Sequence, residues 1–537
     1  MKWAWITLAV AVFSTVAIGQ EIKNSSKPDV TKPGSAEWAA NQNSIGNTLK
    51  EQATSVEGPD TARLFSEAAA AYRRALQVLT RDSMPQDWAT TQHSLGYVLQ
   101  EQGVRTNGAE AAQLLSDAVA AYKQALQVRT REQLPLHWAM TQNDLGNALQ
   151  AQGARAEGAE ARRLLAEAAS AYGAALLFFT REFLPRQWAM TQHNLGSALH
   201  EQGTRTDGPD GVKLLGEAVA AYRQALLVRT REQMPQGWAI TQNSLGNALQ
   251  AQGTRADKPE SLRLLDQALA AYGQSLLVFT REQTPRLWAM TKHNVGSALQ
   301  EQGMRTDGPE AQRLFGAAVS AYREALLVWN RQQLPQQWAM AQNNLARAYF
   351  NLSQWNSAAE SYESVLEVHP DFRPAYERAR FLEQEVLFNY ERTFKLNESW
   401  LKRNPDDLAA LAGLAETYFT TGKFDECARR ISAVLSDQRF DATITVPLRA
   451  LEIANLIALH RPAEVPARLK ILIEAVESQP AGFKMQRSFK GIERFIDVNQ
   501  QFAANKEWLL QLFAGMFGEN RDAISKKLRT SSETFKN

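Results

Sequence analysis

The chain has 537 residues, of which 44% are hydrophobic and 22% are charged, and its formal net charge at pH 7 is +2. This composition is sufficient for a packed core, and it lacks the excess of positive charge typical of proteins that bind nucleic acid. The single cysteine, Cys427, excludes an intrachain disulfide and metal sites built on paired cysteines. No glycine-rich phosphate loop and no His-Glu-x-x-His motif occurs. We therefore expect a protein that is not an enzyme and that has no metal site and no other cofactor.

Residues 1–19 have the features of a secretory signal peptide. Lys2 precedes an uncharged run, and the small residues Ala17 and Gly19 suit a signal peptidase. An uncleaved membrane anchor is the alternative, although such an anchor usually needs about 20 apolar residues. We expect an exported protein, periplasmic or extracellular, in which the polar residues 20–36 form a flexible leader.

Seven tryptophans recur at intervals of 50 residues. They are Trp38, Trp88, Trp138, Trp188, Trp238, Trp288 and Trp338. Around most of them the sequence repeats P-x-x-W-A-x-T-Q-x-x-L-G, then a break, then A-x-x-A-Y-x-x-A-L. A fixed period of this length is typical of a solenoid, because each unit buries its apolar face against copies of itself. We expect six full repeats over residues 37–336, with the tryptophans in the repeat core.

Each repeat is predicted to contain two helices, which we call the A helix and the B helix. The A helix begins at a proline, and its apolar stripe contains the tryptophan and the leucines seven and eleven positions later. We expect it to end at the glycine before the break. These glycines are Gly103, Gly153, Gly203, Gly253 and Gly303. Two B helices contain an internal glycine, Gly173 or Gly273, and close approach of a neighbouring helix is the expected reason.

The repeats alternate in type. Repeats with His93, His193 and His293 alternate with repeats that carry Asn143 and Asn243 at the same position. The larger repeat is therefore a pair of 100 residues.

Residues 337–437 follow the pattern of large and small residues of the tetratricopeptide repeat (TPR). Leu345, Ala346, Tyr349, Ala358, Tyr362 and Pro370 match it once, and Leu414, Ala415, Tyr418, Gly422 and Cys427 match it again. The 50-residue units resemble the same repeat with about ten additional residues between the two helices. The resemblance implies an all-α, right-handed solenoid of helix-turn-helix repeats whose partners are proteins.

Two positions on the A helix, five and nine residues after the tryptophan, are predicted to lie opposite its leucine stripe. In TPR proteins this face lines the inner groove, and similar asparagine ladders in superhelical TPR proteins hold extended peptides. An amide suits this role because it donates and accepts hydrogen bonds as a peptide unit does. The alternative is that these side chains are solvated or bond within the array. The candidate peptide-binding residues are Asn43, His93, Asn143, His193, Asn243, His293, Asn343, Asn47, Tyr97, Asn147 and Asn247.

The repeat period fades after residue 437. Residues 438–518 are predicted to form a helical C-terminal cap, and residues 519–537 a loose polar tail. Within the cap, residues 502–517 are amphipathic, and covering the last apolar face of the solenoid is favoured over contact with a membrane.

Taken together, the sequence predicts an exported TPR-like solenoid that binds a peptide or protein segment in its concave groove, as an adaptor or scaffold. One alternative is a structural spacer or a scaffold that assembles with copies of itself. A second is a membrane-associated assembly factor that contacts the membrane through residues 502–517.

The signal peptide gives the first testable prediction. The mature protein should begin at Gln20, because Ala17 and Gly19 provide the small residues that a signal peptidase requires. N-terminal sequencing of protein purified from its native source measures this directly. A membrane-bound form that still begins at Met1 would show that the segment is an anchor.

Overall fold

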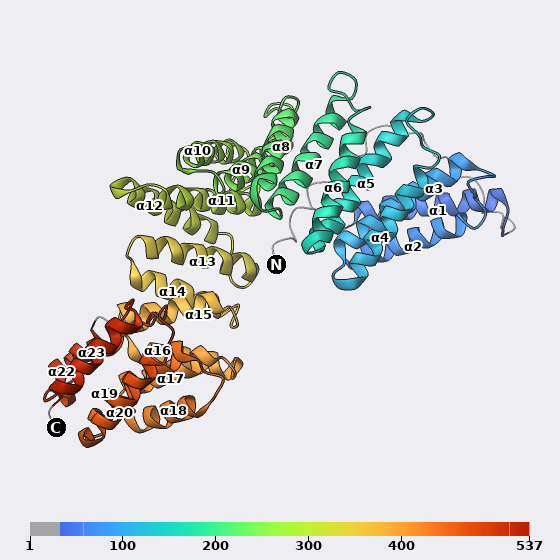
Figure 1. The fold of residues 1–537 in the computed structure, drawn as a ribbon. Coiled ribbons are helices and arrows are strands. Elements are labelled where there is room, and N and C mark those ends of the chain that lie inside the picture. The colour runs from blue at the N-terminus through green and yellow to red at the C-terminus, as the bar shows by residue number, and fades with distance from the viewer. Residues whose placement is uncertain (1–32, 57, 515, 536–537) are drawn as a thin grey trace. The chain divides into compact units, whose positions relative to one another are not determined.

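The structure, a computed structural model, describes residues 33–56, 58–514 and 516–535. The expected signal peptide and most of the expected leader lie outside these residues. Within them every regular element is a helix, as the repeat pattern predicts (Figure 1). None of the described helices is long and apolar enough to cross a bilayer. The described residues divide into two compact units, one that ends at Leu287 and one that begins at Trp288.

The first unit is a series of helical hairpins. Each A helix packs against the B helix that follows it, and each B helix packs against the next A helix (Figure 1). The hairpins are α1 (Ala36–Ser55) with α2 (Pro59–Ala75), α3 (Pro85–Arg105) with α4 (Gly108–Ala125), α5 (Pro135–Arg155) with α6 (Gly158–Ala175), α7 (Pro185–Thr204) with α8 (Gly208–Leu226), and α9 (Pro235–Gly253) with α10 (Lys258–Ser275). Six prolines stand at the first position of a helix where the sequence predicts an A helix, since α11 (Pro285–Met304) and α13 (Pro335–Asn351) also begin at one.

Each hairpin is held together by a tyrosine of its B helix, whose ring packs against a glycine of its A helix. Tyr272 is fully buried, and a Cβ added at Gly246 would lie 2.5 Å from its Cε1. The same pairing occurs between Gly146 and Tyr172, where that distance would be 2.6 Å. The glycine therefore allows a closer approach of the two helices than any other residue would.

The predicted ends of the A helices are wrong in four repeats. Helix α3 continues past Gly103 to Arg105, and only α9 ends at its glycine, Gly253. Gly103 is needed for packing, since a Cβ there would lie 2.8 Å from Cγ of Leu115. The left-handed backbone conformation occurs instead at the glycines that begin B helices, such as Gly108, with φ of 71°. Three other glycines were also expected to end their A helices, and each of these helices continues past its glycine. They are Gly153, Gly203 and Gly303.

The expected reason for Gly173 and Gly273 is also wrong. No atom outside their own helices lies within 4 Å of a Cβ added at either glycine. No neighbouring helix approaches them closely, and the structure shows no packing reason for either residue.

The tryptophans are core residues only in part. Trp88 is buried with 9% of its surface exposed, and the other six are half-buried. Trp138 and Trp188, from successive repeats, pack against the same buried cluster around Phe179. The tryptophans therefore lie at the joints between repeats, near the surface.

The second unit begins with two further hairpin helices and continues into a helical C-terminal region. Its helices are α11, α12 (Gly308–Leu326), α13 (Pro335–Asn351), α14 (Trp355–Leu366), α15 (Arg373–Phe381), the π-helix η2 (Leu382–Val386), α16 (Tyr390–Arg403), α17 (Leu408–Thr420), α18 (Phe424–Ser436), α19 (Ala442–Ala458), η3 (Pro462–Glu464), α20 (Val465–Glu477), α21 (Lys490–Val498), η4 (Gln500–Phe502), α22 (Lys506–Phe513) and α23 (Arg521–Thr534).

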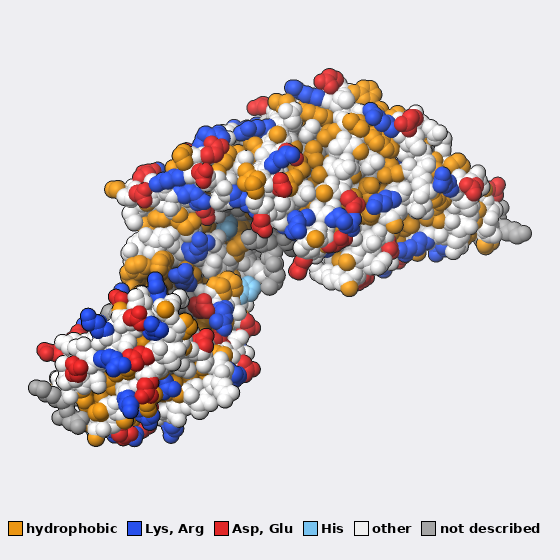
Figure 2. Space-filling model, viewed as in Figure 1, with side chains coloured by type: hydrophobic (Ala, Val, Ile, Leu, Met, Phe, Trp, Pro, Cys, Tyr) orange, Lys and Arg blue, Asp and Glu red, His pale blue; other side chains and the backbone are white. Residues whose placement is uncertain are grey.

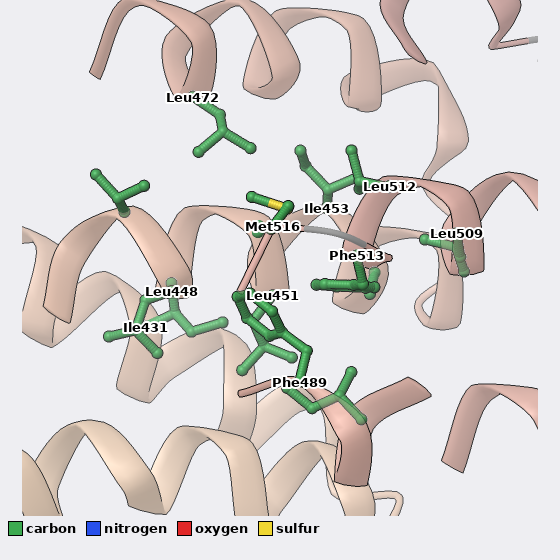
Figure 3. Packing of buried hydrophobic residues seen from close by; sticks show 14 of the residues in the cluster. Ile431, Leu448, Leu451, Ile453, Leu472, Phe489, Leu509, Leu512, Phe513 and Met516 are labelled. Carbon is green, nitrogen blue, oxygen red and sulfur yellow. The ribbon is translucent and has the colours of Figure 1, made fainter. Parts of the chain in front are cut away.

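The amphipathic segment at residues 502–517 buries its apolar side in the core of this unit. Leu512, Phe513 and Met516 are at most 1% exposed, and Figure 3 shows them among other apolar side chains of the cluster. Only Phe517 presents a large apolar surface to solvent, with 58% exposed. The face that would contact a membrane is therefore occupied by protein.

The predicted loose tail is mostly helical. Helix α23 covers residues 521–534, and its Ile524 and Leu528 are fully buried in the same core as residues 502–517. We missed this helix because its two buried apolar residues stand in an otherwise polar sequence.

The contrast between two kinds of helical glycine gives a matched pair of substitutions. Gly246→Ala should destabilise the protein by about 1–3 kcal/mol, because the new methyl group overlaps the ring of Tyr272. Gly273→Ala should stabilise it by about 0.5–1 kcal/mol, because the position is helical and open. Urea unfolding of both variants checks the pair. Equal effects of the two substitutions would contradict the proposed packing.

Candidate binding face on the A helices

The A helices α5, α7 and α9 present the same kinds of side chain at the same positions. We define the A-helix face by these residues: Met140, Asp144, Asn147, Met190, Ser197, Ile240, Ser244 and Asn247. All of them are half-buried except Met140, which is 43% exposed. Apolar side chains therefore form one row, two residues after the tryptophans, and polar side chains form a second row further along the helices.

The first candidate series, five residues after the tryptophan, does not lie on this face as expected. Asn143, Asn243 and His293 are buried, with 4%, 3% and 7% of their surfaces exposed, so their predicted exposure is wrong. The remaining members are half-buried, namely Asn43, His93, His193 and Asn343. Their positions lie opposite the leucine stripe of their own helix, but the next A helix packs there.

Hydrogen bonds connect this series to the following repeat. The Asn43 amide donates to Oγ1 of Thr91 at 2.7 Å. The Thr191 hydroxyl donates to Oδ1 of Asn143 at 3.1 Å. Histidines of the series also contact the following repeat: His193 Nδ1 lies 3.2 Å from Thr241 Oγ1, and His93 Nε2 lies 3.1 Å from Asp144 Oδ2. The series therefore holds neighbouring A helices together.

In the second unit the buried His293 makes a different contact. Its Nε2 lies 3.0 Å from the amide nitrogen of Asn344, and its ring lies beside that of Trp329. This contact also connects one repeat to the next.

The second candidate series, nine residues after the tryptophan, holds the B helix of its own repeat. The hydroxyls of Tyr72, Tyr172 and Tyr272 each donate to an asparagine Oδ1 at 2.8 Å. The acceptors are Asn47, Asn147 and Asn247. In the second repeat this position is Tyr97, which is half-buried, and burial raises its pKa to about 12. Asn47 is exposed, and the other members keep part of their side chains open to a partner.

A set of arginines that the sequence analysis missed forms a further connection between repeats. Arg155 Nη2 donates to the backbone carbonyl of Val104 at 2.9 Å, and Arg205 Nη2 to that of Ala154 at 3.1 Å. Arg255 Nη1 donates to the carbonyl of Gly203 at 2.7 Å. Each arginine therefore caps the end of the preceding A helix, where unpaired carbonyls favour a cation. The sequence signal is an arginine two residues after each glycine of the break.

Burial controls the titration of the histidines on α7. Burial and the neighbouring Arg229 hold the pKa of His193 well below its usual value. Burial and Arg255 lower the pKa of His200 to about 4. The ring of His200 is therefore neutral at mildly acidic pH, and the ring of His193 stays neutral to lower pH than a free imidazole does.

Charged side chains of both signs are interspersed on the surface of each unit seen in Figure 2, without a large block of either sign. Among the residues that the structure describes, no group of three or more His, Cys, Asp or Glu side chains is arranged to hold a metal ion.

Comparison with known proteins identifies one repeat directly. A family model described as a tetratricopeptide repeat matches residues 338–369, which contain most of α13 and all of α14. Two similar solved structures are the C-terminal part of a TPR repeat-containing protein from Cytophaga hutchinsonii and yeast Tom70. The first is 11% identical, covers 62% of this chain and 97% of its own, and has a TM-score of 0.37. Tom70 is 11% identical, covers 93% of this chain and 95% of its own, and has a TM-score of 0.28. No curated protein matches the chain.

The contacts of Asn143 give a prediction about stability. Asn143→Ala should destabilise the protein by about 1–3 kcal/mol, because the buried hydroxyl of Thr191 loses its acceptor. Ser44→Ala, at an exposed position of the first A helix, is the control and should change little. Thermal unfolding compares the two variants. If Asn143→Ala is as stable as Ser44→Ala, the amide does not join the repeats.

Proposed function

We propose that this chain, a series of stacked helical hairpins that carries a tetratricopeptide repeat, binds a segment of a partner protein on its A-helix face. In this role it acts as an adaptor or scaffold, without catalysis. The partner segment would lie across successive A helices and contact each of them in a similar way.

One observation carries the proposal, namely the repetition of the same two rows of side chains on neighbouring A helices. Met140, Met190 and Ile240 form a partly exposed apolar row, and methionine is common on protein-binding surfaces because its side chain adapts to different partners. The polar row, which includes Asn147 and Asn247, offers groups that can pair with a peptide backbone. A periodic surface of this kind suits an extended chain, whose own backbone is periodic.

The binding surface that we propose includes only part of the peptide-binding residues that the sequence predicts. The residues five positions after the tryptophan, such as Asn143, contribute by fixing the spacing of the A helices. The residues at two, six and nine positions after it would contact the partner, since these side chains are accessible, except for Asn194, which is 5% exposed.

We also propose that the protein acts outside the cytoplasm, because residues 1–19 resemble a signal peptide. A spacer or a scaffold that assembles with copies of itself is the alternative function. The exposed leucines Leu177, Leu227 and Leu277, 57%, 49% and 48% exposed, favour it, because they form a second periodic apolar row at the ends of the B helices.

Affinity capture from the exported protein fraction, with three matched variants, tests the proposal. The first replaces Met140 and Asn147 by lysine, the second replaces Leu177 and Leu227, and the third replaces Ser170 and Ala220 on the exposed side of the B helices. Each variant adds two positive charges. We expect loss of the partner only with the first variant, by at least about tenfold in affinity.

Loss of the partner only with the leucine variant would move the binding site to the ends of the B helices. If capture recovers only copies of the chain itself, and the leucine variant abolishes this self-association, the alternative function replaces the proposed one.

A further inference from the structure

Two arginines, Arg129 and Arg229, occupy equivalent places 100 residues apart in the duplicated pair of repeats. Each follows a B helix and reaches a threonine on the next A helix. Arg129 Nη1 donates to Thr141 Oγ1 at 3.1 Å, and Arg229 Nη1 to Thr241 Oγ1 at 2.9 Å. A histidine, His93 or His193, accompanies each of them. The chain therefore contains two copies of one polar site.

The first copy contains its own counter-charge. Asp144 Oδ2 lies 3.1 Å from Nε2 of His93, and the negative charge of Asp144 also favours the charged form of Arg129. The second guanidinium nitrogen of Arg129 donates to Oγ1 of Thr90 at 3.2 Å. The first copy thus supplies this arginine with a nearby negative charge and with a hydrogen-bond acceptor for each of its two terminal guanidinium nitrogens.

The second copy lacks both of these groups. Ser244 stands where the first copy has Asp144, and Met190 stands where it has Thr90. Within the described part of the chain, no carboxylate is paired with Arg229 or with His193. Burial lowers the pKa of Arg229 to about 10.

Part of the second copy is accessible. Thr241 is fully buried, but Arg229, His193 and Ser244 are half-buried, whereas Arg129 in the first copy is 5% exposed. Ser244 and Met190 belong to the A-helix face, so the site opens next to the apolar row. A cation in this position is costly unless an anion accompanies it, and an arginine pairs most strongly with a carboxylate.

We propose that Arg229, His193 and Ser244 form a receptor for a carboxylate, which an acidic side chain of the partner protein supplies, while the buried Thr241 holds the guanidinium of Arg229 in place. This carboxylate takes the place that Asp144 occupies in the first copy. The apolar Met190 beside it favours an acidic residue flanked by apolar ones. That a partner protein supplies the carboxylate rests on the proposed function, whereas the existence of the carboxylate site does not.

The duplication supplies the variants for a test with acetate as the probe. The full mature chain is labelled with ¹³C-histidine, and the ring resonances of His193 and His93 are followed by NMR over pH with and without acetate. A carboxylate beside the ring stabilises the imidazolium form, so acetate should raise the pKa of His193 in the wild type. The resonances are assigned with His193→Gln and His93→Gln.

Two exchanges between the copies should reverse this behaviour. Ser244→Asp supplies the missing charge, so His193 should titrate at higher pH and no longer respond to acetate. Asp144→Ser removes the charge from the first copy, so His93 should become responsive to acetate. The melting temperature should rise with Ser244→Asp and fall with Asp144→Ser. This readout shows that both variants fold. A His193 that does not respond in the wild type, or that responds equally in Ser244→Asp, overturns the site.

The partner is tested separately by affinity capture with Ser244→Asp, and Ser197→Asp is the control with the same charge change on the same face. We expect Ser244→Asp to weaken partner binding at least tenfold and the control to weaken it less. Equal binding by wild type and Ser244→Asp, together with a response to acetate, would assign the site to a free anion and overturn the role of the partner. If no partner is captured at all, the proposed function fails while the acetate response still decides the site.

Discussion

The close contact between a B-helix tyrosine and an A-helix glycine is the constraint on which the rest of the structure depends. A ring such as that of Tyr172 rests against the backbone of the A helix at Gly146, and its hydroxyl reaches the amide of Asn147 on the same helix. One side chain therefore fixes both the distance between the two helices and their register. Because the same contact recurs, each hairpin presents its A helix to its neighbours in the same way.

Contacts between hairpins include directional polar bonds beside their apolar packing. Amides and histidines bond threonines of the next repeat, and arginines cap the carbonyl ends of the preceding A helix. Directional bonds of this kind fix the spacing of successive A helices, which apolar packing of alanines alone specifies less tightly. A uniform spacing is what a surface needs if it is to contact an extended partner chain at regular intervals.

The sequence correctly predicted features within each hairpin, but it did not predict the contacts between neighbouring hairpins. The 50-residue period correctly located all six prolines at helix starts. The exposure of Asn143 was wrong, because a helical wheel locates a residue relative to its own helix and not to the next repeat. The arginine caps were missed because only the arginines recur in the sequence, whereas their acceptors are backbone carbonyls, which no residue type marks. The uncompensated charge at Arg229 emerged only when the two copies of the site were compared in space.

The central claim is that a partner lies on the A-helix face, and site-specific photocrosslinking tests it most directly. A photoreactive residue is placed at Ser197 on α7 or, in a second protein, at Ser170 on the exposed side of α6. Irradiation in the exported fraction should give a covalent adduct with one partner from position 197 and none from position 170. An adduct from position 170 alone would contradict the account, because the partner would then lie on the B helices.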